Sequence, residues 1–188
     1  LAAADHVREV LNSFDAHGRA VPIVLDPVMV AKGGHALLAE DAVGLIRDEL
    51  TALAELVTPN APEAEALTGL AVESVDDQRR AAEILVRKLG ARAALVKGGH
   101  IAGETIFDVL LTEAGFTVFE SPRIATRATH GTGCTLASAI AVRIALGEGI
   151  ARAVEQGRSY LMEAIRAAPG LGQGHQPLGH GWPMARLG

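Results

Sequence analysis

The residues best suited to chemistry are the six from His130 to Thr135, which read His-Gly-Thr-Gly-Cys-Thr and open a long apolar stretch. Glycines allow backbone N–H groups to approach an anion closely, and the start of a helix adds partial positive charge. Cys134 is the single cysteine of the sequence, and a thiol in such a field loses its proton below the usual pKa of about 8.5. Gly131 to Cys134 therefore predict an anion-binding turn with a reactive side chain beside it.

Two other interpretations of this turn are open from the residues alone. Cys134 could be a buried, inert cysteine at a tight helix entry, because free cysteines are often buried. It could also be a covalent nucleophile with His130 as its base, although no third group that would orient this pair is evident. The spacing is neither that of a Walker loop, which needs Gly-x4-Gly-Lys-Ser/Thr, nor that of a dinucleotide fingerprint, which needs Gly-x-Gly-x-x-Gly after a strand.

Further polar residues come after short apolar runs, where buried strands are expected to end: Asp26 after residues 22–25, Asn60 and Glu63 after residues 56–58, and Lys97 after residues 93–96. Because ligands of parallel α/β sheets bind outside the carboxyl ends of the strands, we expect these groups to share a cleft with the Gly131–Cys134 turn. The carboxylates could hold a hydrated Mg²⁺ and the lysine could contact a phosphate. Their structural interpretations are an Asp-Pro turn, a helix cap and a solvated lysine.

The elements that must position these residues alternate between strands and helices. Hydrophobic spacing and turn residues predict helices over residues 2–16, 43–53, 63–67, 74–89, 131–146 and 150–167, strands over 22–25, 56–58 and 93–96, and a hairpin over 105–111 and 116–119. A glycine-containing loop is expected at residues 32–35. This order predicts an α/β sandwich with a mostly parallel sheet. His175 and His180 lie in the closing Gly/Pro/His-rich tail, which we interpret as a flexible polar segment and not as a metal site.

Composition limits the classes of function. The 188 residues are 49% hydrophobic and 21% charged, which fits one globular domain, and aromatic residues are so few (3%) that Ala, Val, Leu and Ile must fill the core. A net charge of −5 without a basic stripe argues against nucleic acid as a partner. One cysteine forms no internal disulfide, so we expect a reducing, cytoplasmic setting. No apolar run reaches the roughly 18 residues that a membrane helix needs.

Four motifs occur in a set order: Asp26-Pro-Val-Met29, Thr58-Pro-Asn-Ala-Pro-Glu63-Ala64, Val96-Lys-Gly-Gly-His100 and His130-Gly-Thr-Gly-Cys-Thr135. Together they closely resemble the hydroxymethylpyrimidine/phosphomethylpyrimidine kinases, the thiamin-pathway members of the ribokinase-like superfamily. Residues 108–110 and 174–180 extend the likeness over nearly the whole chain. The resemblance implies a three-layer α/β/α sandwich, with residues 1–188 forming a single kinase domain that lacks its amino-terminal strand and substrate loop.

The resemblance further implies MgATP-dependent phosphorylation of 4-amino-5-hydroxymethyl-2-methylpyrimidine and then of its monophosphate. Carried over residue by residue, it implies that Cys134 accepts the proton of the attacking hydroxyl and that the backbone of Gly131, Thr132, Gly133 and Cys134 forms the anion hole. It implies that Asp26 and Glu63 hold Mg²⁺ largely through water and that Asn60, Lys97 and Thr129 lie near the nucleotide phosphates. Val28 and Cys134 would line the pyrimidine pocket.

Other functions remain possible from the sequence alone. A pyridoxine or pyridoxal kinase of the same superfamily would show similar motifs, and a chain without its amino-terminal segment could bind nucleotide without turnover. The expected partners are a small pyrimidine substrate and ATP, with no nucleic acid and no membrane. An exposed sheet edge also makes a homodimer an expectation.

Overall fold

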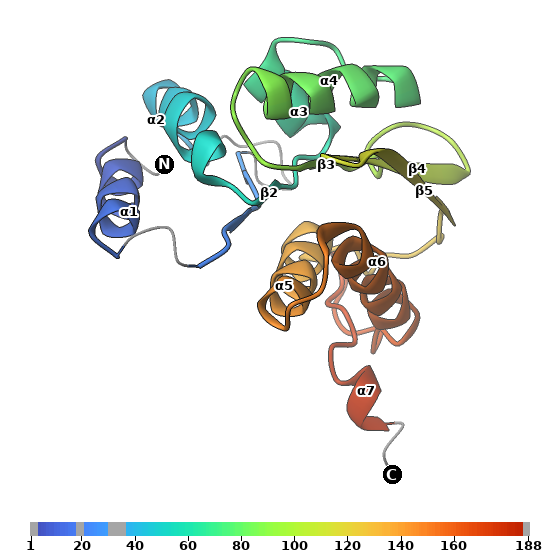
Figure 1. Cartoon of the computed structure of the whole chain (residues 1–188). Helices are drawn as coiled ribbons and strands as arrows, with labels where there is room; N and C mark the ends of the chain where they lie inside the picture. Colours follow the sequence, from blue (N-terminus) through green and yellow to red (C-terminus); the bar gives the residue numbers. More distant parts are fainter. Residues whose placement is uncertain (1–3, 18–20, 30–36, 186–188) are drawn as a thin grey trace. The chain divides into compact units, whose positions relative to one another are not determined.

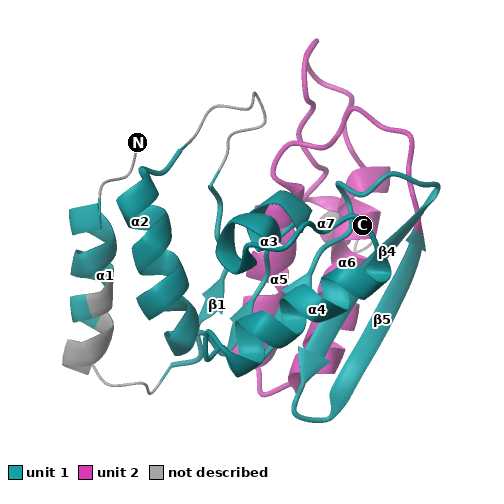
Figure 2. Ribbon diagram, turned by 90° about the horizontal axis from the view of Figure 1, so that it is seen from above, with its two compact units in different colours: residues 1–121 teal, residues 122–188 magenta. Residues whose placement is uncertain are grey.

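The computed structural model describes residues 4–17, 21–29 and 37–185 (Figure 1). The chain divides into two compact units, residues 1–121 and 122–188, which Figure 2 colours separately. The loop expected at residues 32–35 lies outside the described residues.

The described elements follow the predicted order as far as α6, and α7 is a short helix that the sequence patterns did not predict. They are α1 (Ala4–His17), β1 (Val24–Leu25), α2 (Glu40–Leu45), β2 (Leu56–Val57), α3 (Ala61–Thr68), α4 (Val75–Arg87), β3 (Ala94–Val96), β4 (Thr105–Thr112), β5 (Gly115–Pro122), α5 (Thr132–Ala145), α6 (Ile150–Arg166) and α7 (Trp182–Ala185). After α2 the helix widens into a π-helical turn over Ile46–Leu50, where the Thr51 hydroxyl donates to the carbonyl of Ile46 at 2.8 Å.

The sheet of the first unit is mixed, which corrects the prediction of a mostly parallel sheet. Its strand order is β1-β2-β3-β4-β5, with β1–β2 and β2–β3 parallel and β3–β4 antiparallel, Val96 lying opposite Val109. The reason is the short connection between β3 and β4. Residues 97–104 are fewer than the dozen or so that a parallel crossover needs, so β4 returns beside β3 in the opposite direction.

One face of this sheet carries the main core of the first unit. The core joins the turn after α2, helices α3 and α4 and inward-facing strand residues, and its members are small or branched: Met29, Ile46, Leu50, Ala54, Val57, Ala61, Ala64, Leu67, Val72, Ala81, Ala82, Leu85, Ala91, Ala94, Val96 and Leu111. The expectation of a core filled by Ala, Val, Leu and Ile is confirmed. Ala81 and Ala82 are fully buried, so helix α4 can lie close to the sheet.

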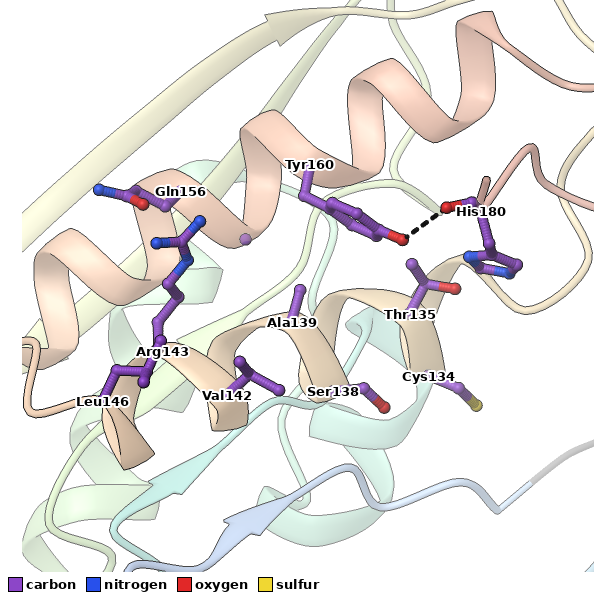
Figure 3. Close-up of a pocket in the computed structure, with 11 residues that line it drawn as sticks. Cys134, Thr135, Ser138, Ala139, Val142, Arg143, Leu146, Gln156, Tyr160 and His180 are labelled. Carbon is purple, nitrogen blue, oxygen red and sulfur yellow. Dashed lines mark hydrogen bonds between the residues drawn. The ribbon is translucent and has the colours of Figure 1, made fainter. Parts of the chain in front are cut away.

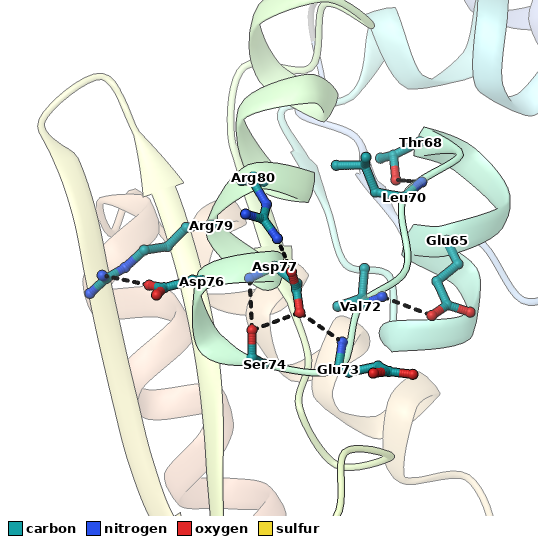
Figure 4. Close-up of polar contacts among 10 residues, drawn as sticks. All are labelled: Glu65, Thr68, Leu70, Val72, Glu73, Ser74, Asp76, Asp77, Arg79 and Arg80. Atoms are coloured by element: carbon teal, nitrogen blue, oxygen red, sulfur yellow. Dashed lines mark hydrogen bonds and ion pairs between the residues drawn. The ribbon is translucent and has the colours of Figure 1, made fainter.

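The start of α4 is fixed by the cap that the sequence predicts (Figure 4). The Ser74 hydroxyl accepts from the backbone N–H of Asp77 at 3.2 Å and donates to the Asp77 carboxylate at 2.6 Å. The Glu73 N–H also donates to this carboxylate, and Arg80 pairs with it. The hydrogen bond from Ser74 is the main reason why the pKa of Asp77 lies below its usual range.

Gln78, one turn into α4, ties the helix to the sheet. Its buried Nε2 donates to the carbonyl of Val96 at 3.0 Å and to that of Phe107 at 2.8 Å, where β3 and β4 separate. The Gly98 N–H donates to the buried Asp108 carboxylate at 2.9 Å. A Cβ on Gly98 would overlap the carbonyl oxygen of Phe107, so only glycine fits there.

The second unit is built on α5 and α6, which pack against each other. Gly157 on α6 lies so close to Ile140 on α5 that a Cβ would stand 2.8 Å from the Ile140 side chain. Farther along, the rings of Tyr160 and Trp182 lie 5.7 Å apart. No helix in the described part of the chain is long and apolar enough to span a membrane.

We expect Gly98→Ala to lower the free energy of unfolding by about 1–3 kcal/mol, because the added methyl forces the β3–β4 connection away from Phe107. Gly99→Ala is the matched control, since nothing lies within 4 Å of a Cβ at that position. Urea unfolding followed by far-ultraviolet circular dichroism measures both. Equal midpoints for the two variants would show that the close approach at Gly98 carries no strain.

Candidate functional site

Side chains from three parallel strand ends meet, and two of them donate to the carboxylate of the third. Asp26 follows β1, Thr58 follows β2 and Lys97 follows β3. One oxygen of Asp26, Oδ1, accepts from Lys97 Nζ at 2.9 Å and from the Thr58 hydroxyl at 3.1 Å. The Lys97 and Asp26 side chains are only 12% and 13% exposed, so water screens this ion pair little. The predicted convergence of Asp26 and Lys97 is therefore confirmed within the first unit, and the solvated-lysine interpretation is wrong.

Asn60 and Glu63 lie at the same edge and form a reciprocal cap at the start of α3. The Asn60 carboxamide oxygen accepts from the Glu63 N–H at 3.0 Å, and the Asn60 N–H donates to Glu63 Oε2 at 2.8 Å. The cap interpretation is thus confirmed. Asn60 also pairs with Lys97 as a parallel bridge, and the Lys97 N–H donates to Pro59 O at 2.8 Å, which extends the β2–β3 pairing past both strands.

Burial raises the pKa of the Glu63 carboxyl above its usual value. The hydrogen bond from the Asn60 N–H and the charge of Lys97 act in the opposite direction, and the charge of Asp26 adds to the rise. Glu63 is 6% exposed, so removal from water outweighs these partners. The folded protein therefore holds the Glu63 proton more tightly than the unfolded chain does.

The two carboxylates fit a hydrated cation better than a fully dehydrated one. Among the described residues no cluster of three His, Cys, Asp or Glu side chains could hold a metal. Asp26 Oδ1 and Glu63 Oε2 are already engaged by protein donors. Mg²⁺ usually keeps several waters and takes one or two carboxylates together with substrate phosphates, and the second oxygens of Asp26 and Glu63 suit that mode.

Val28, the candidate for the pyrimidine pocket, lies two residues beyond Asp26. Its N–H donates to the carbonyl of Asp26 at 2.9 Å, which turns the chain, and its side chain is 38% exposed. The next residue, Met29, is buried in the core. Val28 therefore sits beside the carboxylate cluster with its side chain open to solvent, and its contact with a pyrimidine stays a prediction.

The Gly131–Cys134 turn belongs to the second unit. Gly131 has φ +76°, a left-handed conformation that glycine adopts without strain, and no side chain caps α5 there. The first intrahelical bond runs from the Thr135 N–H to Gly131 O at 2.9 Å. Cys134 is exposed, which rules out the interpretation of a buried, inert cysteine. A shared cleft between this turn and the Asp26–Lys97 cluster of the first unit stays a prediction.

Thr129, the third candidate for the nucleotide phosphates, is held from two sides. Its carbonyl accepts from the Thr132 hydroxyl at 3.4 Å, and its hydroxyl lies 3.1 Å from His175 Nδ1. The interpretation of the tail as a flexible polar segment is wrong at this point. His175 and Gln176 contact the residues in front of α5, because the tail also carries an apolar anchor, Leu178, that is 5% exposed.

A groove of about 610 Å³ runs between α5 and α6 in the second unit (Figure 3). Cys134, Ser138 and Val142 line it from successive turns of α5, and Tyr160 lines it from α6. The Tyr160 hydroxyl donates to the carbonyl of His180 at 3.2 Å. The Cys134 side chain thus lies at the end of a groove large enough for a small molecule.

Sequence reasoning missed three contributors. Thr58 was part of a motif but received no role, although it stands at a strand end as Asp26 and Lys97 do. Asp108 holds the Gly98 N–H, and Gln176 holds the chain in front of α5. Only Thr58 had a signal that pointed to the site, namely its place after an apolar run.

Comparison with known proteins adds independent findings. The family model described as phosphomethylpyrimidine kinase matches residues 1–179. A thiamine biosynthesis bifunctional protein, ThiED, of Geobacter sulfurreducens is 49% identical over 158 residues, which are 84% of this chain and 32% of that protein. The hydroxymethylpyrimidine/phosphomethylpyrimidine kinase of Bacillus subtilis is 40% identical over 178 residues, 94% of this chain and 65% of that kinase. The chain therefore spans 32% and 65% of the lengths of these two relatives.

Among solved structures, an ADP complex of Bacillus subtilis pyridoxal kinase matches with a TM-score of 0.87 and 31% identity. The match covers 100% of this chain and 70% of that structure. The fold of the chain is therefore that of this group of kinases, and the ribokinase-like fold expected from the motifs is confirmed. The three-layer arrangement of the two units stays a prediction.

We expect Glu63→Gln to gain stability relative to the wild type as the pH rises through and above the usual glutamate range. Because the folded-state pKa is raised, the stabilising effect of the proton is complete below the unfolded-state pKa and is lost as the pH passes the folded-state pKa. Urea unfolding of both proteins between about pH 4 and 7.5 measures this difference.

Glu65→Gln controls for the same change two residues along α3. A Glu63→Gln protein that loses stability relative to the wild type at higher pH would mean that the folded site favours the ionised carboxylate.

Proposed function

The chain belongs to the phosphomethylpyrimidine kinase family, and from this premise we propose that it transfers phosphoryl groups from ATP to a hydroxymethylpyrimidine. The first acceptor is the hydroxyl of 4-amino-5-hydroxymethyl-2-methylpyrimidine, and the second is the phosphate of the resulting monophosphate. The observation that carries the proposal is the family match over residues 1–179, because this range contains both the Asp26–Lys97 cluster and the Gly131–Cys134 turn.

The α5 turn supplies the positioning and charge that phosphoryl transfer requires. A helix leaves its first N–H groups without intrahelical partners, and at Gly131 no side chain takes their place. We assign the backbone N–H groups of the turn, from Gly131 to Cys134, to the oxygens of the transferring phosphoryl group. Exposed Cys134, in the first turn of α5, is placed to receive a proton from an acceptor bound there.

The strand-end cluster supplies the charges for the nucleotide. Lys97 uses one of its three N–H donors on Asp26 and keeps two for phosphate oxygens. Asp26 and Glu63 would hold Mg²⁺ largely through water, and Asn60 lies beside Lys97 at the same edge. When bound, Mg²⁺ would neutralise the charge of the nucleotide phosphates. The ADP complex of the similar Bacillus subtilis pyridoxal kinase supports the assignment of a nucleotide to this fold.

In the proposed first transfer, one bond to phosphorus forms and one breaks. The hydroxyl oxygen of the pyrimidine forms a bond to the γ-phosphorus of ATP, and the bond between this phosphorus and the ADP oxygen breaks. The hydroxyl proton goes to the Cys134 thiolate. In the second transfer the attacking atom is a phosphate oxygen, which is largely ionised at neutral pH because the second phosphate pKa is about 6. In that step most of the attacking oxygens carry no proton, so a general base contributes little.

A pyridoxal kinase is the second candidate, and the match to the Bacillus subtilis pyridoxal kinase at a TM-score of 0.87 favours it. A chain that binds nucleotide without turnover is the third. The second candidate would phosphorylate pyridoxal, and the third would release no ADP, so both can be told from the leading proposal by their products.

We expect the purified protein to release ADP only when Mg²⁺, ATP and either the hydroxymethylpyrimidine or its monophosphate are present together. A coupled ADP assay with product identification by mass spectrometry measures this, with pyridoxal as a parallel substrate. ADP release with pyridoxal alone would replace the leading proposal by the second. ATP binding in calorimetry without ADP release from any of these substrates would replace it by the third.

We expect Cys134→Ala to lower kcat for the hydroxymethylpyrimidine by about 10²–10⁴-fold, the usual contribution of a positioned base. The loss for the monophosphate should be at least tenfold smaller, because its attacking oxygen is already ionised. Ser159→Ala, an exposed change of similar size on α6, is the control and should match the wild type. Equal losses for both substrates would contradict a role of Cys134 as base and indicate a role in binding.

A further inference from the structure

The segment after α6 folds back onto the residues that lead into α5. The Gln176 N–H donates to the carbonyl of Arg127 at 2.8 Å, and the His130 N–H donates to the carbonyl of Gln176 at 3.4 Å. Both backbone groups of Gln176 thus hold the two ends of residues 127–130. Next to it, His175 Nδ1 lies 3.1 Å from the Thr129 hydroxyl.

An apolar anchor keeps this C-terminal segment (residues 175–179) in place. Leu178, which is 5% exposed, packs with the fully buried Ala128 and Ala164. The Gly179 N–H donates to the carbonyl of Ala164 at 2.8 Å, and a Cβ on Gly179 would overlap the carbonyl of Ala167. The segment is therefore seated on the end of α6 and on the chain in front of α5 at once.

The Gln176 side chain ties the C-terminal segment to the turn that follows α6. Its Nε2 donates to the carbonyls of Gly170 and Gly172 at 3.3 and 3.2 Å. Both glycines have positive φ, so they shape the turn by which the chain leaves α6. One residue therefore joins this turn, through its side chain, to residues 127–130, through its backbone.

The turn that follows residues 127–130 has little stiffness of its own. Gly131 and Gly133 restrict the backbone less than any other residue would, and no side chain caps α5. An anion site made of backbone N–H groups works only if those groups are held in place before the ligand arrives. The position of this turn must therefore come from its flanking residues, which the C-terminal segment holds.

We propose that Gln176 is a positioning residue that fixes the N–H groups of the Gly131–Cys134 turn for phosphoryl transfer. This inference rests on the proposed function of the turn. The backbone of Gln176 holds residues 127–130, and its side chain holds that backbone in place through the carbonyls of Gly170 and Gly172. Loss of the side chain therefore leaves the groups of the turn present but displaced.

The test compares Gln176→Ala with Gln173→Ala, an exposed glutamine of the same tail. Cys134 is the sole cysteine, so its rate of alkylation by iodoacetamide over a range of pH reports the geometry of the turn without any need for kinase activity. We expect Gln176→Ala to change this rate at least threefold, and to lower kcat at least tenfold with the KM for the pyrimidine within twofold. Gln173→Ala should match the wild type in all of these values.

Each outcome decides the proposal. A Gln176→Ala protein with a lower melting temperature but unchanged alkylation and kcat would overturn it and leave the segment a purely structural role. Altered alkylation in a protein whose wild type phosphorylates nothing would retain the positioning role and reject the proposed function. If Gln176→Ala does not fold, Gln176→Glu keeps the size of the side chain and removes the two Nε2 donors to Gly170 and Gly172. The same changes are expected from it, and wild-type values would overturn the proposal.

Discussion

A single carboxylate oxygen, Asp26 Oδ1, joins the ends of three parallel strands. It accepts from Lys97 and from Thr58, which lie about 70 and 30 residues farther along the chain. Parallel strands are linked by crossovers and not by tight turns, so few local contacts bring their ends together. Because the ion pair is largely shielded from water, loss of either partner would leave an uncompensated charge, which typically costs several kcal/mol. The edge of the sheet is thus organised around the group that the proposed site uses.

At the start of α3, too, the same residues have a structural role and a proposed functional role. Asn60 and Glu63 cap the helix, and both stand at the edge where a nucleotide would lie. The structural and the functional interpretation of this motif are therefore not alternatives. The cap engages one oxygen of Glu63, and burial of the side chain raises the pKa of this carboxyl although the hydrogen bond from the cap acts in the opposite direction.

Local signals predicted most of the elements, and the rule that strand ends share one edge predicted the meeting of Asp26 and Lys97, while other long-range contacts could not be predicted. Ser74 and Asp77 mark the start of α4 within the sequence itself, and Gly90, with its positive φ, follows the end of the helix. The hairpin shows its turn residues in the same way. The place of β4 beside β3 depends on strand pairing, which short connections limit but periodicity does not reveal. Gln176 is likewise a common polar residue in a glycine-rich tail, and only its contact with the carbonyl of Arg127 indicates a role for it.

The fold-back of residues 175–179 also sets an order of events during synthesis. A chain leaves the ribosome from its amino end, so the turn at Gly131 is made before the segment that holds residues 127–130 in place. At about 5–20 residues per second, the two are separated by seconds. A nascent or prematurely terminated chain could therefore contain helices α5 and α6 while its anion turn is still unsupported. The turn thus gains its support only after residues 175–179 have been made.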